Sequence, residues 1–195
     1  DTQRGLANAL LTDGQLDEAQ KILTTIVTAE PQDAQSQIHL SEIQRRQGHY
    51  DDALATLEKA KPLAPDSLDL SYNEALIYDS LGRYDEATGV LTKLLSGSAH
   101  ADGKYSDQEK ANRAIFLERL GIIYREENRT TDAVAAYKQI VALGGDFVKG
   151  GYQGQVDAYR DAHQWKDATA VAADAAKGLP NEHGIQLMYA GQLAD

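Results

Sequence analysis

Apolar side chains recur along most of the chain at the spacing of one helix face, which predicts helices rather than strands. Two such segments follow each other closely five times, so we expect five helical pairs joined by short turns. The expected helices span about 1–12 and 16–28, 33–47 and 50–61, 66–81 and 84–96, 107–127 and 130–142, and 148–162 and 165–177. A further apolar stripe predicts a last helix at about 183–193, carried by Ile185, Met188, Tyr189 and Leu193.

A short sequence phrase recurs between the two helices of each pair. Its copies at 14–19, 48–53 and 82–87 begin with glycine, end with alanine and are spaced 34 residues apart. Weaker copies follow at 128–133 and 163–168. The alanine of the fourth copy comes 46 residues after that of the third, so an insertion of about 12 residues precedes the fourth copy.

The residue types in the phrase suit a helical hairpin. The opening glycine ends the first helix, where a left-handed residue is needed. The acid three residues later lies in the first turn of the second helix, at the positive end of the helix dipole. The alanines, which allow close approach of the paired helices, are Ala19, Ala53, Ala87, Ala133 and Ala168. Pro31, Pro65 and Pro180 are expected to stop the second helix.

This pattern resembles the tetratricopeptide repeat family, whose period is 34 residues. Gly121 and Tyr124 carry the front half of the family pattern in the fourth copy, and Leu57 and Pro65 carry the back half in the second. The resemblance implies an all-α fold, a right-handed α-solenoid of five tetratricopeptide-type helical hairpins plus a C-terminal helix. It implies a single domain over 1–195, with repeats at approximately 1–33, 34–67, 68–101, 114–148 and 149–182, an insertion at 102–113, and a partial sixth repeat or cap at 183–195.

The resemblance also implies a binding groove. In this family the first helix of each repeat lines a concave surface that holds a protein or peptide, so we predict a protein–protein interaction scaffold. The apolar residues at groove-facing positions are Ile38, Tyr72, Leu76 and Ile122. The charged residues at an equivalent position of successive repeats are Arg45, Asp79, Arg125 and Arg160. Apolar anchors beside arginine favour peptide binding.

Three other interpretations of these features stay open. Arg45, Asp79 and Arg125 could pair with one another and only stiffen the stack. The uncapped ends could drive self-association, which would make the chain a structural solenoid. Because residue 1 is Asp rather than Met, the chain could also be a regulatory or targeting segment of a larger protein.

The two-carboxylate clamp that some members of this family use is not expected here. Arg4 and Asn8 match its first pair, but Asp69 stands where a cation is required. His39 and Asn73 replace the other clamp residues. A bound carboxylate would be repelled by Asp69.

The composition and charge of the chain argue against several classes of function. The net charge of −11 makes binding to nucleic acids or anionic membranes improbable. No apolar run approaches the length of a membrane-spanning helix. The chain has no cysteine, which excludes disulfides and thiolate chemistry and leans slightly towards a bacterial periplasmic or envelope location. No cofactor, metal site or nucleophile with its base is recognisable, so we predict no enzymatic activity.

The insertion and two other features give specific structural expectations. Ser106 and Glu109 form a capping-box pattern, so we expect the insertion to extend the first helix of the fourth repeat at its start. Trp165 is expected to be a packing residue because it occupies the place of Tyr50 and Tyr84. The glycines expected to mark a loose turn and a weak helix start, and not a phosphate loop, are Gly144, Gly145, Gly150, Gly151 and Gly154.

Overall fold

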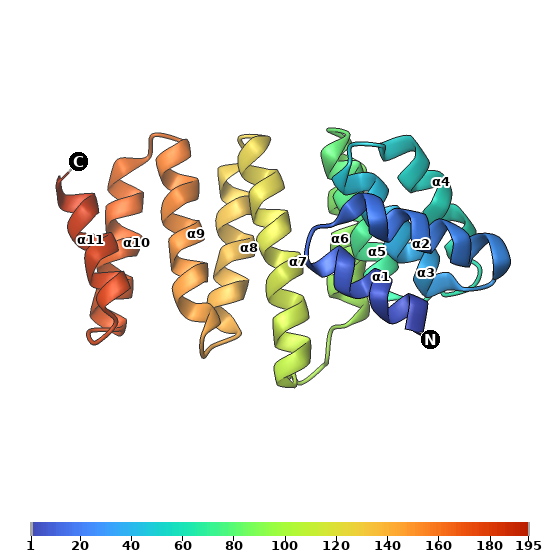
Figure 1. The fold of residues 1–195 in the computed structure, drawn as a ribbon. Coiled ribbons are helices and arrows are strands. Elements are labelled where there is room, and N and C mark those ends of the chain that lie inside the picture. The colour runs from blue at the N-terminus through green and yellow to red at the C-terminus, as the bar shows by residue number, and fades with distance from the viewer. Residues whose placement is uncertain (1, 195) are drawn as a thin grey trace. The chain divides into compact units, whose positions relative to one another are not determined.

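A computed structural model describes residues 2–194 of the protein, and all regular structure in that range is helical (Figure 1). The eleven helices are α1 (Thr2–Thr12), α2 (Leu16–Ala29), α3 (Ala34–Arg46), α4 (Tyr50–Ala60), α5 (Leu68–Ser80), α6 (Tyr84–Gly97), α7 (Asp107–Glu126), α8 (Thr130–Ala142), α9 (Phe147–Asp161), α10 (Trp165–Gly178) and α11 (His183–Ala194). Each expected helix is present within a few residues of its expected bounds. The prediction of an all-α tetratricopeptide-type solenoid is confirmed. None of these helices is long and apolar enough to cross a bilayer.

The chain divides into two compact units, residues 1–94 and residues 95–195. The first contains α1 to α5 and most of α6, and the second contains α7 to α11. Each unit has its own core.

The core of the first unit includes two apolar clusters. One lies between α1, α2 and α3, around Leu23 and Ile43, and the other lies between α3, α4 and α5, around Leu57 and Ile77. These four side chains are almost completely buried. Burying each contributes on the order of 1.5–3 kcal/mol, so the clusters hold the hairpins together.

The turn between paired helices has the same backbone conformation in every repeat. Gly14, Gly48 and Gly82 all have a positive φ, as their position at the end of the first helix predicts. Asn128 and His163 occupy the same position in the fourth and fifth copies, with φ of 58° and 56°. The weaker copies of the phrase therefore build the same turn without glycine.

The insertion extends α7 as predicted. α7 begins at Asp107, and the Ser106 hydroxyl accepts a hydrogen bond from the backbone N–H of Glu109 (3.3 Å). The Glu109 carboxylate in turn accepts from the backbone N–H of Ser106 (2.8 Å). This reciprocal capping box satisfies two donors that a helix start would otherwise leave without partners.

In the second unit, the side chain of Tyr137 fills the space between three helices. Tyr137 belongs to α8, and Gly121 of α7 and Gly154 of α9 lie against its ring. A Cβ atom at either glycine would overlap the ring. Gly151 similarly lets the backbone of α9 approach that of α8 at Val141. The expectation for Gly151 and Gly154 was therefore wrong, since they are buried contact points rather than signs of a weak helix start. Gly144 and Gly145 do form the turn, both with positive φ.

Two aromatic and apolar residues are more exposed than the sequence predicts. Trp165 is 49% exposed, and its ring lies beside the His163 ring and under the Arg160 guanidinium rather than in the core, so its assignment as a packing residue was wrong. In α11, Ile185 is buried against α10, and Met188 and Tyr189 pack beside it. Leu193 does not join this stripe and is 63% exposed.

The glycines of α9 allow a matched stability test. Gly154→Ala should lower the free energy of unfolding by about 1–3 kcal/mol, because the added methyl group overlaps the Tyr137 ring. Gly150→Ala should raise it by about 0.5–1 kcal/mol, because nothing lies within 4 Å of its Cβ position and alanine favours the helix. Urea denaturation followed by circular dichroism measures both. Equal effects of the two substitutions would contradict the proposed close contact.

Candidate functional site

A recess in the first unit collects half of the predicted groove residues. It lies between α3 and α5, has a volume of about 260 Å³ and is lined by Ile38, His39, Glu42, Arg45, Asp69, Tyr72, Asn73 and Leu76. Ile38, Arg45, Tyr72 and Leu76 were expected to meet on one surface, and here they do.

The apolar side of the recess comes from α5. Leu70, Ala75 and Ile77 of this helix are buried in the core. Tyr72 and Leu76 are one helical turn apart and only partly buried. Because α5 carries apolar residues around much of its circumference, these two remain on the open face after the core face is covered. They are the apolar surface that a ligand could contact.

Ile38 contributes differently from the other apolar residues. It is only 3% exposed and belongs to the core cluster that contains Leu57 and Leu70. It therefore forms the floor of the recess and offers little free surface to a partner. This burial corrects the prediction that Ile38 faces the groove as an anchor.

A chain of hydrogen bonds fixes Arg45 at the edge of the recess. Its Nε–H donates to the side-chain oxygen of Asn73 (3.2 Å), and Asn73 donates through Nδ2 to the hydroxyl of Ser41 (3.1 Å). Ser41 donates to the backbone carbonyl of Ala53 in α4 (3.0 Å). Asn73 is only 5% exposed, so this network joins α3, α4 and α5 inside the protein. Buried polar groups that are all satisfied specify one geometry, here that of the arginine.

Asn73 has a structural role that was not predicted from the sequence. It was considered only as a replacement in a carboxylate clamp. Its spacing from Leu70 and Ile77 places it on the buried stripe of α5, and an asparagine on such a stripe indicates a buried hydrogen-bond network.

Acidic side chains form the rest of the rim. Glu42 of α3 makes a loose ion pair with Arg46 (3.6 Å), and Asp69 at the start of α5 is exposed. His39 hydrogen-bonds to Gln35 one turn earlier (2.8 Å). The recess thus combines an apolar side, one fixed arginine and two carboxylates.

Arg4, which matched the first clamp position, interacts within the protein. Its Nε–H donates to the Asp33 carboxylate (2.7 Å), and it forms an ion pair with Glu30. Asp33 also caps α3, accepting from the backbone N–H and the hydroxyl of Ser36. Arg4 therefore ties α1 to the start of α3.

The remaining predicted groove residues do not line this recess. Asp79 is partly buried near the end of α5. In the second unit, Ile122 is partly buried on α7, and Arg125 forms an ion pair with Asp161 of α9 (2.7 Å). Burial disfavours the charge of Arg125, but the hydrogen bond to Asp161, together with the Tyr137 hydroxyl nearby, outweighs it and raises its pKa. Arg160 lies over the Trp165 ring (5.6 Å). Arg125 therefore braces α7 against α9 through Asp161, whereas the stiffening interpretation named Arg45 and Asp79 as its partners.

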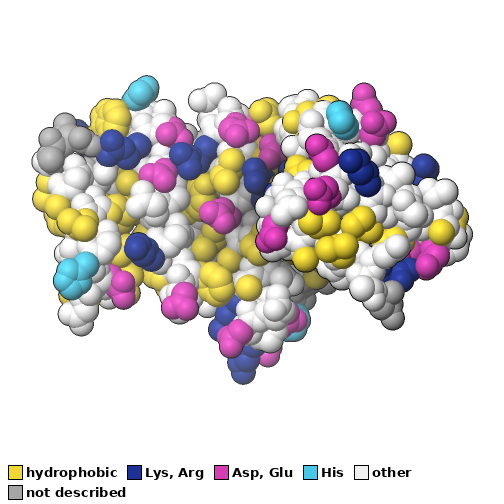
Figure 2. Space-filling view, in the orientation of Figure 1, with side chains coloured by type: hydrophobic (Ala, Val, Ile, Leu, Met, Phe, Trp, Pro, Cys, Tyr) yellow, Lys and Arg dark blue, Asp and Glu magenta, His cyan; other side chains and the backbone are white. Residues whose placement is uncertain are grey.

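The charged side chains on the face shown in Figure 2 are interspersed, with acids and bases alternating among apolar and neutral groups. Among the described residues, no group of histidine, aspartate or glutamate is arranged to hold a metal ion. The recess between α3 and α5 offers apolar, cationic and anionic side chains that a partner could contact.

Paired helices of this length, repeated with the same turn, define a helical-repeat scaffold. Models of the tetratricopeptide repeat match residues 4–68, 72–104 and 117–143, and the chain belongs to this family. The family is generally non-enzymatic, and its members act as protein-interaction scaffolds.

Solved structures show the same fold. The putative kinesin light chain of Podosopora anserina, with nearly identical TPR-like repeats, has a TM-score of 0.73 at 17% identity, covering 97% of this chain and 94% of that one. MamA from Desulfovibrio magneticus RS-1 has a TM-score of 0.69 at 17% identity, covering 93% of this chain and 95% of that one. A thermophilic TPR protein of Thermus thermophilus has a TM-score of 0.60 at 20% identity, covering 100% of this chain and 98% of that one. No curated protein sequence matches the chain.

The cap formed by Asp33 makes the stability of the first unit depend on pH. Burial raises the pKa of Asp33, but hydrogen bonds from Ser36 and Arg4 outweigh it, so the pKa lies below its ordinary value. This stabilisation is present above the unfolded pKa of about 3.9 and is lost as the pH falls through the lower folded pKa. Wild type should therefore lose its stability advantage over Asp33→Asn on acidification below about pH 4. Thermal melting of both proteins from neutral to acid pH measures this, and parallel curves would contradict it.

Proposed function

We propose that the recess between α3 and α5 binds a peptide segment of a partner protein. The observation that carries the proposal is the pair Tyr72 and Leu76, which stay partly exposed on the open face of α5 beside the fixed Arg45. An apolar side chain of the partner would contact these two residues. Burying that surface contributes on the order of 1–2 kcal/mol per residue, which makes them the anchors of the interaction.

Arg45 would determine the orientation in which the peptide binds. Its guanidinium is already held by Asn73, so little side-chain freedom is lost when it meets a carboxylate or a backbone carbonyl of the peptide. Glu42 and Asp69 on the rim favour a partner with basic residues next to its apolar anchor. The net charge of −11 acts in the same direction at longer range and weakens as salt is added.

The proposal is tested by selecting binders from a displayed random peptide library and measuring their affinity by calorimetry. Leu76→Asp should abolish binding of the selected peptides and leave helicity nearly unchanged, because Leu76 is not part of the buried core. Leu68→Asp is the matched control, since Leu68 is on the same helix, is exposed and does not line the recess. It should bind like wild type.

Three outcomes separate the possibilities. Loss of binding in both variants would mean that the added negative charge causes the loss, which would count against the recess as the binding site. Unfolding of Leu76→Asp would show that Leu76 is a core residue. Peptides that bind Leu76→Asp as well as wild type would place the binding surface elsewhere.

A second candidate function is self-association through α11. The observation that favours it is the apolar exposure of this helix, where Leu187 is 73% exposed and Leu193 is also open to solvent. If α11 pairs with a second copy, the mass measured by sedimentation equilibrium should rise with concentration. Leu187→Asp should then keep the protein monomeric. A constant monomeric mass for wild type would exclude this function.

A further inference from the structure

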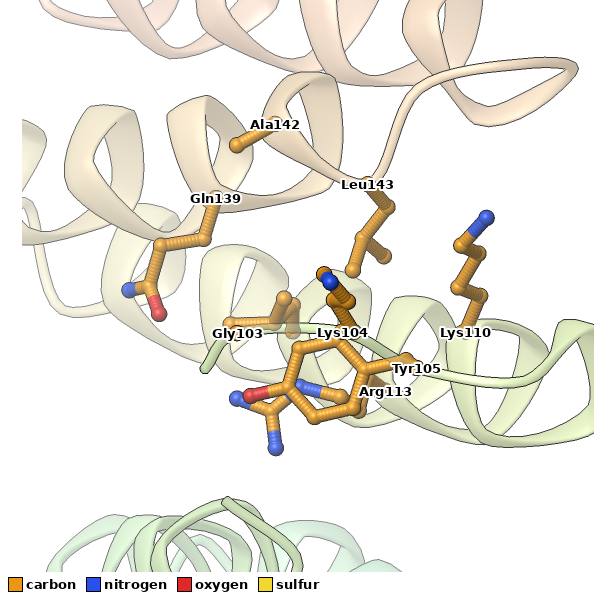
Figure 3. A pocket seen from close by; sticks show the side chains of 9 residues that line it. Gly103, Lys104, Tyr105, Lys110, Arg113, Gln139, Ala142 and Leu143 are labelled. Atoms are coloured by element: carbon orange, nitrogen blue, oxygen red, sulfur yellow. The ribbon is translucent and has the colours of Figure 1, made fainter. Parts of the chain in front are cut away.

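A recess in the second unit is created by the insertion. It has a volume of about 600 Å³, within the usual range for ligand sites. Figure 3 shows its lining side chains, which come from the segment before α7, from the first turns of α7 and from the last turns of α8. The lining residues are Gly103, Lys104, Tyr105, Lys110, Arg113, Leu117, Gln139, Ala142 and Leu143. This oxyanion pocket, as we call it below, has no counterpart in the 34-residue repeat pattern.

The pocket is basic although the chain is acidic. Lys104, Lys110 and Arg113 line it, and none of the described residues that line it is acidic. In Figure 2, basic side chains gather near the lower end of α7, with acidic ones beside them. Because the chain has a net charge of −11, these three basic residues make the recess a local region of positive potential.

The carboxylates that are close in sequence to the basic residues of the pocket do not line it. Asp102 accepts a hydrogen bond from the backbone N–H of Lys104 (3.1 Å). Glu109 forms the capping box with Ser106 and contacts His100 (3.0 Å). Asp107 approaches Lys110 only to 3.9 Å and is fully exposed. These acids therefore leave the lysine ammonium groups able to meet an added anion.

Arg113 is the central group of the pocket. It is 8% exposed, and its Nη1 donates to the backbone carbonyl of Leu95 (2.9 Å) and to the hydroxyl of Ser98 (3.1 Å). The Tyr105 ring lies against its guanidinium (4.4 Å), as Figure 3 shows. Its Nε–H is buried without a hydrogen-bond partner among the described residues. A buried cation without a paired carboxylate is costly, and an anion bound beside it would offset that cost.

The other walls of the pocket are apolar or neutral. Leu117 and Leu143 lie on the α7 and α8 sides, and the Tyr105 ring covers a third side. Gln139 adds an amide that can donate to or accept from a ligand. The pocket therefore suits a molecule with an anionic end and an apolar body.

We propose that the oxyanion pocket binds a carboxylate or phosphate group attached to an apolar body, with Lys104, Lys110 and Arg113 contacting the anion. The same chemistry occurs in a free organic acid or phosphate ester and in an acidic residue of a peptide. The site is separate from the recess between α3 and α5, so it does not depend on the function proposed above.

The test is a titration of the full chain followed by ¹H–¹⁵N NMR. The probes are phenyl phosphate, 3-phenylpropionate, inorganic phosphate, and a capped tripeptide of phenylalanine, glutamate and leucine. We expect saturable shifts of the amides of Lys104, Tyr105 and Leu143 with at least one probe that carries an apolar body, and weaker binding of inorganic phosphate. Tighter binding of the small acids would identify a free anion as the ligand class, and tighter binding of the tripeptide would identify a peptide.

Charge reversal provides the controls. Lys104→Glu and Lys110→Glu should each weaken binding about tenfold or more, the loss expected for one charge-assisted contact. Lys138→Glu changes the net charge equally, but this exposed residue of α8 does not line the pocket, so its affinity should match wild type. Equal weakening in all three variants, or no saturable shift with any probe, would overturn the proposal. Circular dichroism checks that each variant is folded. Lys104→Glu is the variant least expected to disturb folding, because Lys104 is exposed.

Discussion

Close approach of paired helices is the constraint on which this structure depends. The alanine that ends the repeated phrase is completely buried in every copy, at Ala19, Ala53, Ala87, Ala133 and Ala168. A larger side chain at these positions would separate the two helices of a hairpin and leave unfilled space around the leucines and isoleucines that pack between them. The proposed binding surfaces follow from this constraint, because they are formed by the side chains that the close-packed core does not bury.

Much of the fold could be predicted because its signals are local and repeated. A glycine at the end of a helix, a buried alanine every 34 residues and a capping box at Ser106 each depend on neighbours within a few positions in the chain. The start of α7 at Asp107 could be predicted from four consecutive residues for this reason. The weaker copies could be placed by their alignment with the repeat, and there Asn128 and His163 replace glycine and keep its positive φ.

The errors concern residues whose environment is set by other helices. Ile38 and Leu76 both lie at positions expected to face a groove, yet Ile38 is buried under α4 and α5 and Leu76 is not. In the sequence Gly154 resembles a helix breaker, but in the structure it makes room for the Tyr137 ring. The oxyanion pocket was not predicted at all, because Lys104, Arg113 and Leu143 are brought together only when the insertion folds against α7 and α8. Such contacts cannot be inferred from spacing within one helix.

The contact of Tyr137 with Gly121 and Gly154 has a consequence for how the second unit unfolds. In a repeat protein, cooperativity depends on how strong the interfaces between neighbouring repeats are relative to the repeats themselves. Here a single ring from α8 is shared by the helices on both sides, so opening α9 removes packing from α7 as well. The amides of α7, α8 and α9 should therefore exchange with solvent as one cooperative block, whereas α11, which packs mainly on α10, is free to open at lower energy.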